Sequence, residues 1–191
     1  MSTRLNARMA KLMFILFQAA FINNFVLARF LGVSSFIGVS GHLESAVGIG
    51  LTVTLVMFIT SLVTWITYTL VLVPLGATFL QIIFFMLVII VVIQSLKRYL
   101  PDVYLPLITA NCAILGVTVL NVQNQLSLIE SALYGMGGGL GFTLALVLMA
   151  SIRERLSIAD IPRSFQGTPI VFITGAILSI AFTVFSSFSF Y

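Results

Sequence analysis

Long stretches without a charged residue constrain this chain more than any other feature of its sequence. Such runs cover residues 45–96, 103–129, 131–152 and 164–191. A membrane-spanning helix needs about 20 apolar residues to cross roughly 30 Å of hydrocarbon. The first run is therefore long enough for two spans, and each of the other runs holds one.

Composition excludes a water-soluble domain. Hydrophobic residues make up 60% of the 191-residue chain and charged residues only 7%, whereas soluble domains have about a quarter of their residues charged. The net charge of +4 is spread over loops rather than gathered in a stripe, so we do not expect nucleic acid as a partner. The basic residues instead suit topology signals and contacts with the lipid bilayer.

The pattern predicts an all-α integral membrane protein with six transmembrane helices in one domain, residues 1–191. Residues 1–11 form a basic extension, and the first span follows from Leu12 to about Val33. The second, fourth and fifth spans are expected at about 45–73, 103–120 and 127–152, the third ends near residue 96, and the sixth closes the chain. A turn at 74–77 separates spans two and three, because proline fixes φ and glycine relieves the bend.

The distribution of basic residues favours both termini on the outer side. In that orientation the inner loops carry five basic residues, namely Lys97, Arg98, Arg153, Arg155 and Arg163. The opposite orientation places only Arg4, Arg8 and Lys11 inside. Basic residues concentrate on the cytoplasmic side of membrane proteins, so the first arrangement is preferred.

Two short patterns recur in the same order and suggest that the chain consists of two related halves. Residues 34–40 match 112–118, which places Ser34 opposite Cys112 and Gly38 opposite Gly116. The sequence Leu-Glu-Ser-Ala at 43–46 then matches Ile-Glu-Ser-Ala at 129–132. Halves of three spans each start on opposite sides of the membrane, so about 12–96 and 103–190 would form an inverted repeat.

In inverted-repeat membrane proteins, glycine-containing polar segments at matching positions indicate a midplane site between half-helices. Here Gly32, Gly38, Asn111 and Gly116 would frame such a site. The alternative is that these small residues simply allow helices to approach closely.

Polar residues near the membrane centre provide further candidates. Asn23, Asn24 and Thr109 could line a polar path, because polar groups at that depth are costly unless they face protein or water. Cys112 is the only cysteine, so the chain cannot by itself build a four-cysteine metal site. From pattern alone Cys112 is either an inert small side chain or a metal ligand.

Other motifs have structural interpretations. Glu44 and Glu130 begin spans, where a carboxylate favours the helix dipole, and Ser127 with Glu130 fits a capping box. The glycine-rich run 135–141 contains two overlapping GxxxG spacings and lacks the Lys-Ser/Thr ending of a phosphate loop. It therefore predicts close helix packing. No Ser/His/Asp or Cys/His set for nucleophilic catalysis is present.

The chain resembles the RnfA/NqrE-type family of membrane subunits over nearly its whole length beyond residue 12. The segments that carry this resemblance are Asn23–Leu27, Phe30–Gly32, Phe36–Ser40, Leu105–Thr109, Asn111–Ala113, Ser131–Gly135, Ile152–Leu156 and Ala159–Pro162. The resemblance implies a six-span subunit of the bacterial inner membrane that pairs with a homologous RnfE-type subunit of opposite topology. It also implies further Rnf subunits that carry flavin and iron–sulfur groups.

Proteins of this kind pass electrons between ferredoxin and NAD and couple the flow to sodium or proton movement. By resemblance, a [2Fe–2S] cluster lies between the two homologous subunits, each of which supplies one cysteine from each repeat. Cys112 is then the ligand from the second repeat. The family has a cysteine two residues after the glycine of Phe-Leu-Gly, but this chain has Ser34 there. Ser34 as an unusual ligand, another completing group, and an altered or lost cluster all stay open.

The sequence thus predicts a non-catalytic electron-transfer subunit with Cys112 as cluster ligand and Ser34 at the partner position. An inverted-repeat transporter or ion-path subunit without redox chemistry is the alternative from another class. A scaffold subunit that has lost its cluster is a third interpretation.

Overall fold

The structure is a computed structural model that describes residues 2–22, 24–39, 41, 43–98, 105–109 and 111–186. Every secondary-structure element within these residues is helical, which confirms the predicted all-α class. The elements are α1 (Ser2–Phe17), η1 (Gln18–Ile22), α2 (Val33–Val39), α3 (Leu43–Thr67), η2 (Tyr68–Leu72), η3 (Thr78–Leu80), α4 (Gln81–Leu96), α5 (Leu105–Thr109), α6 (Cys112–Gln123), α7 (Leu128–Leu156), η5 (Arg163–Phe165) and α8 (Thr168–Ser186).

Helices suited to crossing a membrane occur at the positions that the charge pattern indicates. Among the described residues four are long and apolar enough, namely Leu43–Leu72, Thr78–Leu96, Leu105–Gln123 and Leu128–Leu156. Two shorter apolar helices, Met9–Ile22 and Thr168–Val184, lie where the first and sixth spans are expected. The integral membrane class is therefore confirmed.

The first span differs from its predicted extent. The sequence predicts a span to about Val33, but the helix ends at Ile22 and residues 24–32 form turns. Asn24 provides the reason, because its Oδ1 accepts the N–H groups of Val26 at 3.1 Å and Leu27 at 3.2 Å. A side chain that bonds nearby backbone amides competes with the helical hydrogen bonds. The chain becomes helical again only at α2.

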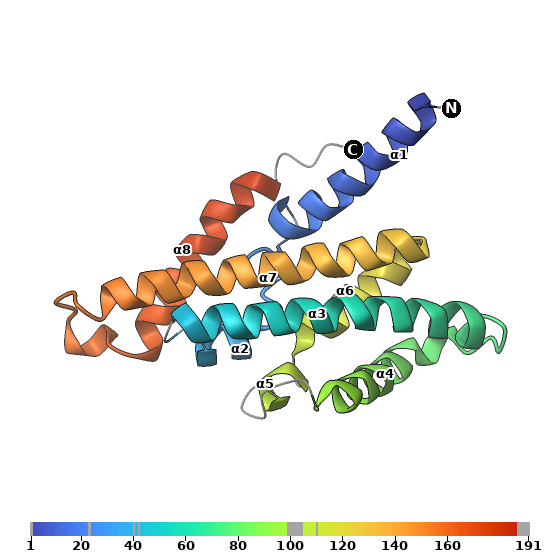
Figure 1. Ribbon diagram of the computed structural model, residues 1–191. Coiled ribbons are helices and arrows are strands. Elements are labelled where there is room, and N and C mark those ends of the chain that lie inside the picture. Colours follow the sequence, from blue (N-terminus) through green and yellow to red (C-terminus); the bar gives the residue numbers. More distant parts are fainter. Residues whose placement is uncertain are drawn as a thin grey trace.

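The long helices α3 and α7 run side by side through the centre of the molecule (Figure 1). They are antiparallel, since Gly50 lies against Thr143 while Gly135 lies against Ser61. The two helices occupy corresponding places in the proposed halves, and an inverted repeat requires such opposite directions. In the same view α4 and α5 lie below this pair, α6 crosses behind α3, and α1 and most of α8 lie above the pair.

The two GxxxG spacings of α7 face two different neighbours. A Cβ on Gly139 would lie 2.5 Å from Thr54 Cα, and one on Gly135 would clash with Ser61 Oγ, both on α3. A Cβ on Gly137 would lie 2.7 Å from the carbonyl oxygen of Leu16, and the equivalent distance from Gly141 to Ala20 is 2.6 Å. These glycines therefore pack α7 against α3 on one side and the first helix on the other, which confirms the predicted packing role.

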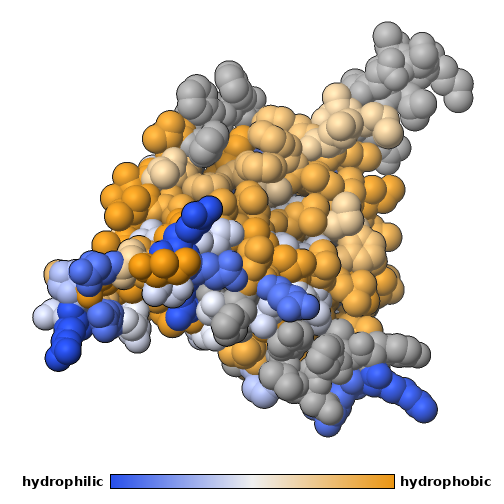
Figure 2. Space-filling view, turned by 60° about the vertical axis from the view of Figure 1, so that its left-hand side comes forward, coloured by the Kyte–Doolittle hydropathy of each residue, from blue (hydrophilic) through white to orange (hydrophobic). Residues whose placement is uncertain are grey.

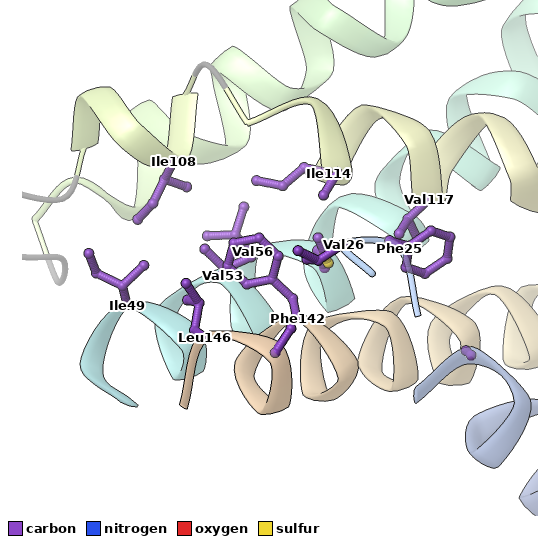
Figure 3. Close-up of a cluster of buried hydrophobic side chains, with 14 of the residues drawn as sticks. Phe25, Val26, Ile49, Val53, Val56, Ile108, Ile114, Val117, Phe142 and Leu146 are labelled. Atoms are coloured by element: carbon purple, nitrogen blue, oxygen red, sulfur yellow. The ribbon is translucent and has the colours of Figure 1, made fainter. Parts of the chain in front are cut away.

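A buried cluster of aliphatic and aromatic side chains joins the central pair to α6 and to the turn after η1. Figure 3 shows side chains of α3, α5, α6 and α7 gathered in one cluster with Phe25 and Val26. The labelled members are Phe25, Val26, Ile49, Val53, Val56, Ile108, Ile114, Val117, Phe142 and Leu146. This packing fixes the start of α6 against the turn at residues 24–32.

Hydrophilic residues gather at the end of the molecule where α7 finishes and η5 lies, and Figure 2 brings this end forward. Orange, apolar residues dominate the surface beyond it. Hydrogen bonds fasten the hydrophilic end: Arg153 donates to the carbonyl of Ile37 at 3.0 Å, and Glu154 accepts the N–H of Leu43 at 3.0 Å. The apolar surface with a polar end is typical of a protein embedded in a bilayer.

Candidate functional site

Cys112 is the first residue of α6, directly after the break that separates α6 from α5. Asn111 caps the helix, because its extended backbone (φ −81°, ψ 107°) lets Oδ1 accept the Ala113 N–H at 3.0 Å. The thiol of Cys112 is exposed. A helix N-terminus carries partial positive charge and stabilises a thiolate or another anion.

The first half of the chain reaches the same point through Gly32. Its backbone N–H donates a hydrogen bond to Cys112 Sγ over 3.0 Å. Gly32 has φ +80°, and a Cβ there would lie 2.8 Å from Phe142 Cε2 and 2.9 Å from Asn111 Oδ1. Glycine is therefore required both by the left-handed backbone and by the close approach that brings the N–H to the sulfur.

A groove of about 650 Å³ opens beside the thiol. It is lined by α4, α5 and α6, including Ile90, Lys97, Asn111 and Cys112. Asn111 is 4% exposed, and its Nδ2 has no hydrogen-bond partner within the described part of the chain. A buried unsatisfied donor costs about 1–3 kcal/mol, and this Nδ2 atom is itself buried although Asn111 lines the groove.

Ser34 lies in the first turn of α2, as Cys112 lies in the first turn of α6. It is exposed, and no hydrogen bond links it to Cys112 in the described structure. The predicted framing glycines contact the neighbouring half: a Cβ on Gly38 would lie 3.7 Å from Leu107, and one on Gly116 would lie 2.6 Å from Leu31. The glycine positions thus lie where the halves meet, and Ser34 lies at the surface.

The predicted polar-path residues are not gathered in one place. Asn24 is fully buried, and its Nδ2 donates to the Gly141 carbonyl at 2.8 Å and to Ala20 at 3.4 Å. Together with the two amides bound by its Oδ1, this uses the whole side chain. Thr109 is exposed and donates to its own helix at Leu105, 2.7 Å away. Asn23 lies outside the described residues.

Sequence reasoning did not identify the Gly32 N–H as a partner of the thiol, or Lys97 and Gln94 as groove residues. The signal for Gly32 was its place just before Ser34 in the repeat. Lys97 had only a topological interpretation, and nothing in the sequence links it to Cys112. Among the described residues no group of three or more His, Cys, Asp or Glu side chains could hold a metal ion. Any metal centre here would need ligands from elsewhere.

Comparison with known proteins identifies the family of this chain. Residues 12–189 match the family model described as Rnf-Nqr subunit, membrane protein. The chain belongs to the Rnf-Nqr family. This family assignment confirms the resemblance deduced from the sequence motifs.

Curated relatives within the Rnf-Nqr family are similar over nearly their whole length. The chain is 46% identical over 185 residues to the A subunit of the Na(+)-translocating ferredoxin:NAD(+) oxidoreductase complex of Acetobacterium woodii, covering 92% of this chain and 96% of the relative. It is 48% identical over 183 residues to the A subunit of the ion-translocating oxidoreductase complex of Actinobacillus pleuropneumoniae, covering 90% and 94%. The corresponding protein of Syntrophotalea carbinolica is 45% identical over 188 residues, covering 93% and 97%.

Proposed function

We propose that this chain is a membrane-embedded electron-transfer subunit of an Rnf-type, ion-translocating ferredoxin:NAD oxidoreductase complex. Similarity to the A subunits of such complexes supports this proposal over nearly the full chain. The observation that carries the redox part is the exposed Cys112 thiol, which receives the Gly32 N–H at the edge of an open groove. The chain alone catalyses nothing, because electrons must enter and leave through other subunits.

The surroundings of Cys112 fit one ligand of a shared [2Fe–2S] cluster. Such clusters are held by cysteine thiolates, and hydrogen bonds to the sulfurs tune their potential. Cys112 would supply the sulfur ligand, it is the first residue of α6, and the Gly32 N–H donates to its sulfur. Asn111 also lines the groove, and its buried Nδ2 has no hydrogen-bond partner among the described residues. When bound, the cluster would supply one-electron transfer.

Ser34 does not fit an ordinary second ligand. A serine hydroxyl has a far higher pKa than a thiol and binds iron only as an alkoxide, whereas iron–sulfur clusters normally take thiolates. Ser34 is also exposed and makes no hydrogen bond with Cys112 in the described structure. We therefore propose Cys112 as the cluster ligand of this chain and expect a homologous partner of RnfE type to provide the others.

Reduced-state EPR and iron analysis of the purified complex test the redox proposal. We expect a rhombic [2Fe–2S] signal in the wild type that disappears in Cys112→Ala, with a matching loss of iron. Thr109→Val is the matched control, because Thr109 lines the same groove but its hydroxyl is bonded to Leu105. An unchanged signal in Cys112→Ala would show that the electron route does not involve this thiol.

Ser34→Cys provides a second test. If the position faces the cluster, restoring a thiol should change the EPR g-values or raise the iron content, without affecting assembly of the complex. A Ser34→Cys spectrum identical to wild type would remove Ser34 from the ligand set. That result would leave the role of Cys112 intact.

A second candidate function, an ion path, is supported by polar atoms buried between α3, α6 and α7. Thr60, Ser61, Asn121 and Ser131 are at most 2% exposed, and their side chains have oxygens without a partner among the described residues. Ser61 lies against Gly135, and Ser131 is one helical turn from Gly135. Oxygen ligands of this type suit hard cations such as sodium.

The substitution Asn121→Leu in the reconstituted complex tests this path. We expect it to reduce the rate of ion transport, relative to wild type, more than the rate of electron transfer. If both rates change by the same factor, this path is excluded.

A further inference from the structure

A polar pocket lies apart from Cys112, between the first helix, α7 and the turn that joins α6 to α7. It encloses about 300 Å³ and is lined by Ile15, Gln18, Arg29, Asn124, Leu126 and Tyr134. Neither the proposed electron route nor the buried oxygens of the proposed ion path involve these residues. The pocket brings together a guanidinium, two amides and a phenol over an apolar floor.

The polar side chains of this pocket have no protein partner among the described residues. Within the described part of the chain, no hydrogen bond or ion pair engages the side chains of Gln18, Arg29, Asn124 or Tyr134. The ring of Tyr134 is fixed by an edge-to-face contact with Phe25, with 5.7 Å between ring centroids. Donors that converge on one space without a protein acceptor suit an anion with several oxygens.

The nearby carboxylate does not cancel the charge of Arg29. Glu130 accepts the N–H and the hydroxyl of Ser127, both at 2.9 Å, and pairs with Lys11 at 2.6 Å. The Lys11–Glu130 pair is neutral overall, so the net charge at the pocket is that of Arg29. The site therefore presents one positive charge and complements a group that carries one negative charge.

Two features place this pocket at the membrane surface. Tyr134 is six residues after Leu128, where α7 begins, which corresponds to about 9 Å along the helix. Trp65 donates its indole N–H to the Leu126 carbonyl, at 2.8 Å, beside the pocket. Tryptophan concentrates at the headgroup level of membrane proteins, and the turn at 124–127 lies at the end of the spans.

We propose that this pocket binds the phosphate of an anionic glycerophospholipid, with Arg29 as the counter-charge and Tyr134, Gln18 and Asn124 as hydrogen-bond donors. A phosphodiester carries one negative charge and several acceptor oxygens, which matches the single cation and its neutral donors. Arginine is well suited to phosphate because its planar donors bind two oxygens at once. The exposed apolar side chains of the first helix, Met13, Phe14 and Phe17, offer a surface for the acyl chains.

Lipid binding to the delipidated, detergent-purified complex tests this proposal. The melting temperature is measured during titration with phosphatidylglycerol, phosphatidylcholine or inorganic phosphate, and retained phospholipid is measured by mass spectrometry. We expect phosphatidylglycerol to raise the melting temperature more than the other two probes. Equal stabilisation by inorganic phosphate would overturn the lipid proposal in favour of a free anion, and no stabilisation by any probe would overturn it outright.

Arg29→Gln should weaken phosphatidylglycerol binding about fivefold, the effect of one basic residue at a membrane surface. Tyr134→Phe should weaken it less while keeping the contact with Phe25. Arg163→Gln in η5 is the control, because it removes an equal charge away from the pocket. Unchanged lipid binding in Arg29→Gln would overturn the assignment, as would loss of another subunit from that variant without loss of lipid. The reduced-state EPR signal should stay unchanged in Arg29→Gln, so this result is separate from the redox proposal.

Discussion

Replacing Gly139 by alanine tests whether close contact between α3 and α7 holds the protein together. The added Cβ would lie 2.5 Å from Thr54 Cα and 2.9 Å from Thr54 Cβ. Carbon atoms normally approach to about 3.5–4.0 Å, so the helices must separate locally by roughly 1 Å. The nearest atom belongs to the backbone, so rotation of a side chain cannot relieve the contact.

The expected net loss of stability is about 1–2 kcal/mol. Overpacking of this kind costs about 1–3 kcal/mol. Separation also stretches the Thr54–Thr143 hydrogen bond, which is 3.1 Å long and of a type worth about 0.6 kcal/mol in a membrane. Against these losses, alanine favours the helix over glycine by up to about 1 kcal/mol.

Equilibrium unfolding in mixed detergent micelles measures this difference. Gly38→Ala in α2 is the matched control, because its Cβ would lie 3.7 Å from Leu107, an ordinary contact. We expect Gly38→Ala to be neutral or slightly stabilising and Gly139→Ala to be destabilising. If Gly139→Ala stabilises the protein as much as the control does, helix propensity outweighs packing and the reasoning is refuted.

Three further substitutions test other contacts by the same unfolding measurement. Asn24→Leu should cost about 1–3 kcal/mol, because the buried Gly141 carbonyl and the Val26 and Leu27 amides lose their partner; a neutral effect would show that the turn does not depend on this side chain. Gly32→Ala should lower the stability of the protein by a similar amount, since alanine at φ +80° is strained and its Cβ meets Phe142. It should also weaken the EPR signal, because the backbone N–H would move away from Cys112 Sγ. Glu130→Gln should cost about 0.5–2 kcal/mol of stability by removing the ion pair with Lys11 and weakening the helix cap. High salt should reduce the stability difference between the variant and wild type. If that difference does not depend on salt, the effect comes from the cap alone.

Much of this architecture follows from the sequence because a bilayer allows few solutions. Charge-free runs long enough to cross hydrocarbon have to become helices, since backbone groups there must bond within their own segment. The turn after Pro74 is confirmed by Gly76 at φ +65°. Glu130 bonds to Ser127 as its spacing predicts. These features depend on neighbours in sequence, so a local pattern suffices to find them.

The site could be predicted only in part. The repeat in the sequence indicates Gly32, Ser34 and Cys112 as candidate site residues. In the structure the Gly32 N–H does lie against Cys112 Sγ. The pattern could not show that Gly32 donates to the sulfur, since the two residues are 80 positions apart in the chain. Three points stay predictions: that Cys112 is a ligand, that a cluster is shared with a partner subunit, and how the chain is oriented in the membrane.

The sequence by itself determined the helical membrane class, the glycine packing of α7 and the family. Tertiary structure decided that the Asn24 side chain can be buried where the first span stops, because only the fold places the Gly141 carbonyl within reach of its amide nitrogen. It also decided which polar side chains have partners. The Asn24 side chain bonds to backbone groups at both its oxygen and its nitrogen. The Arg29 side chain, at the pocket, has no hydrogen bond or ion pair in the described structure. Polar side chains look alike in a sequence, but their free energy depends on whether a distant part of the chain supplies their partner.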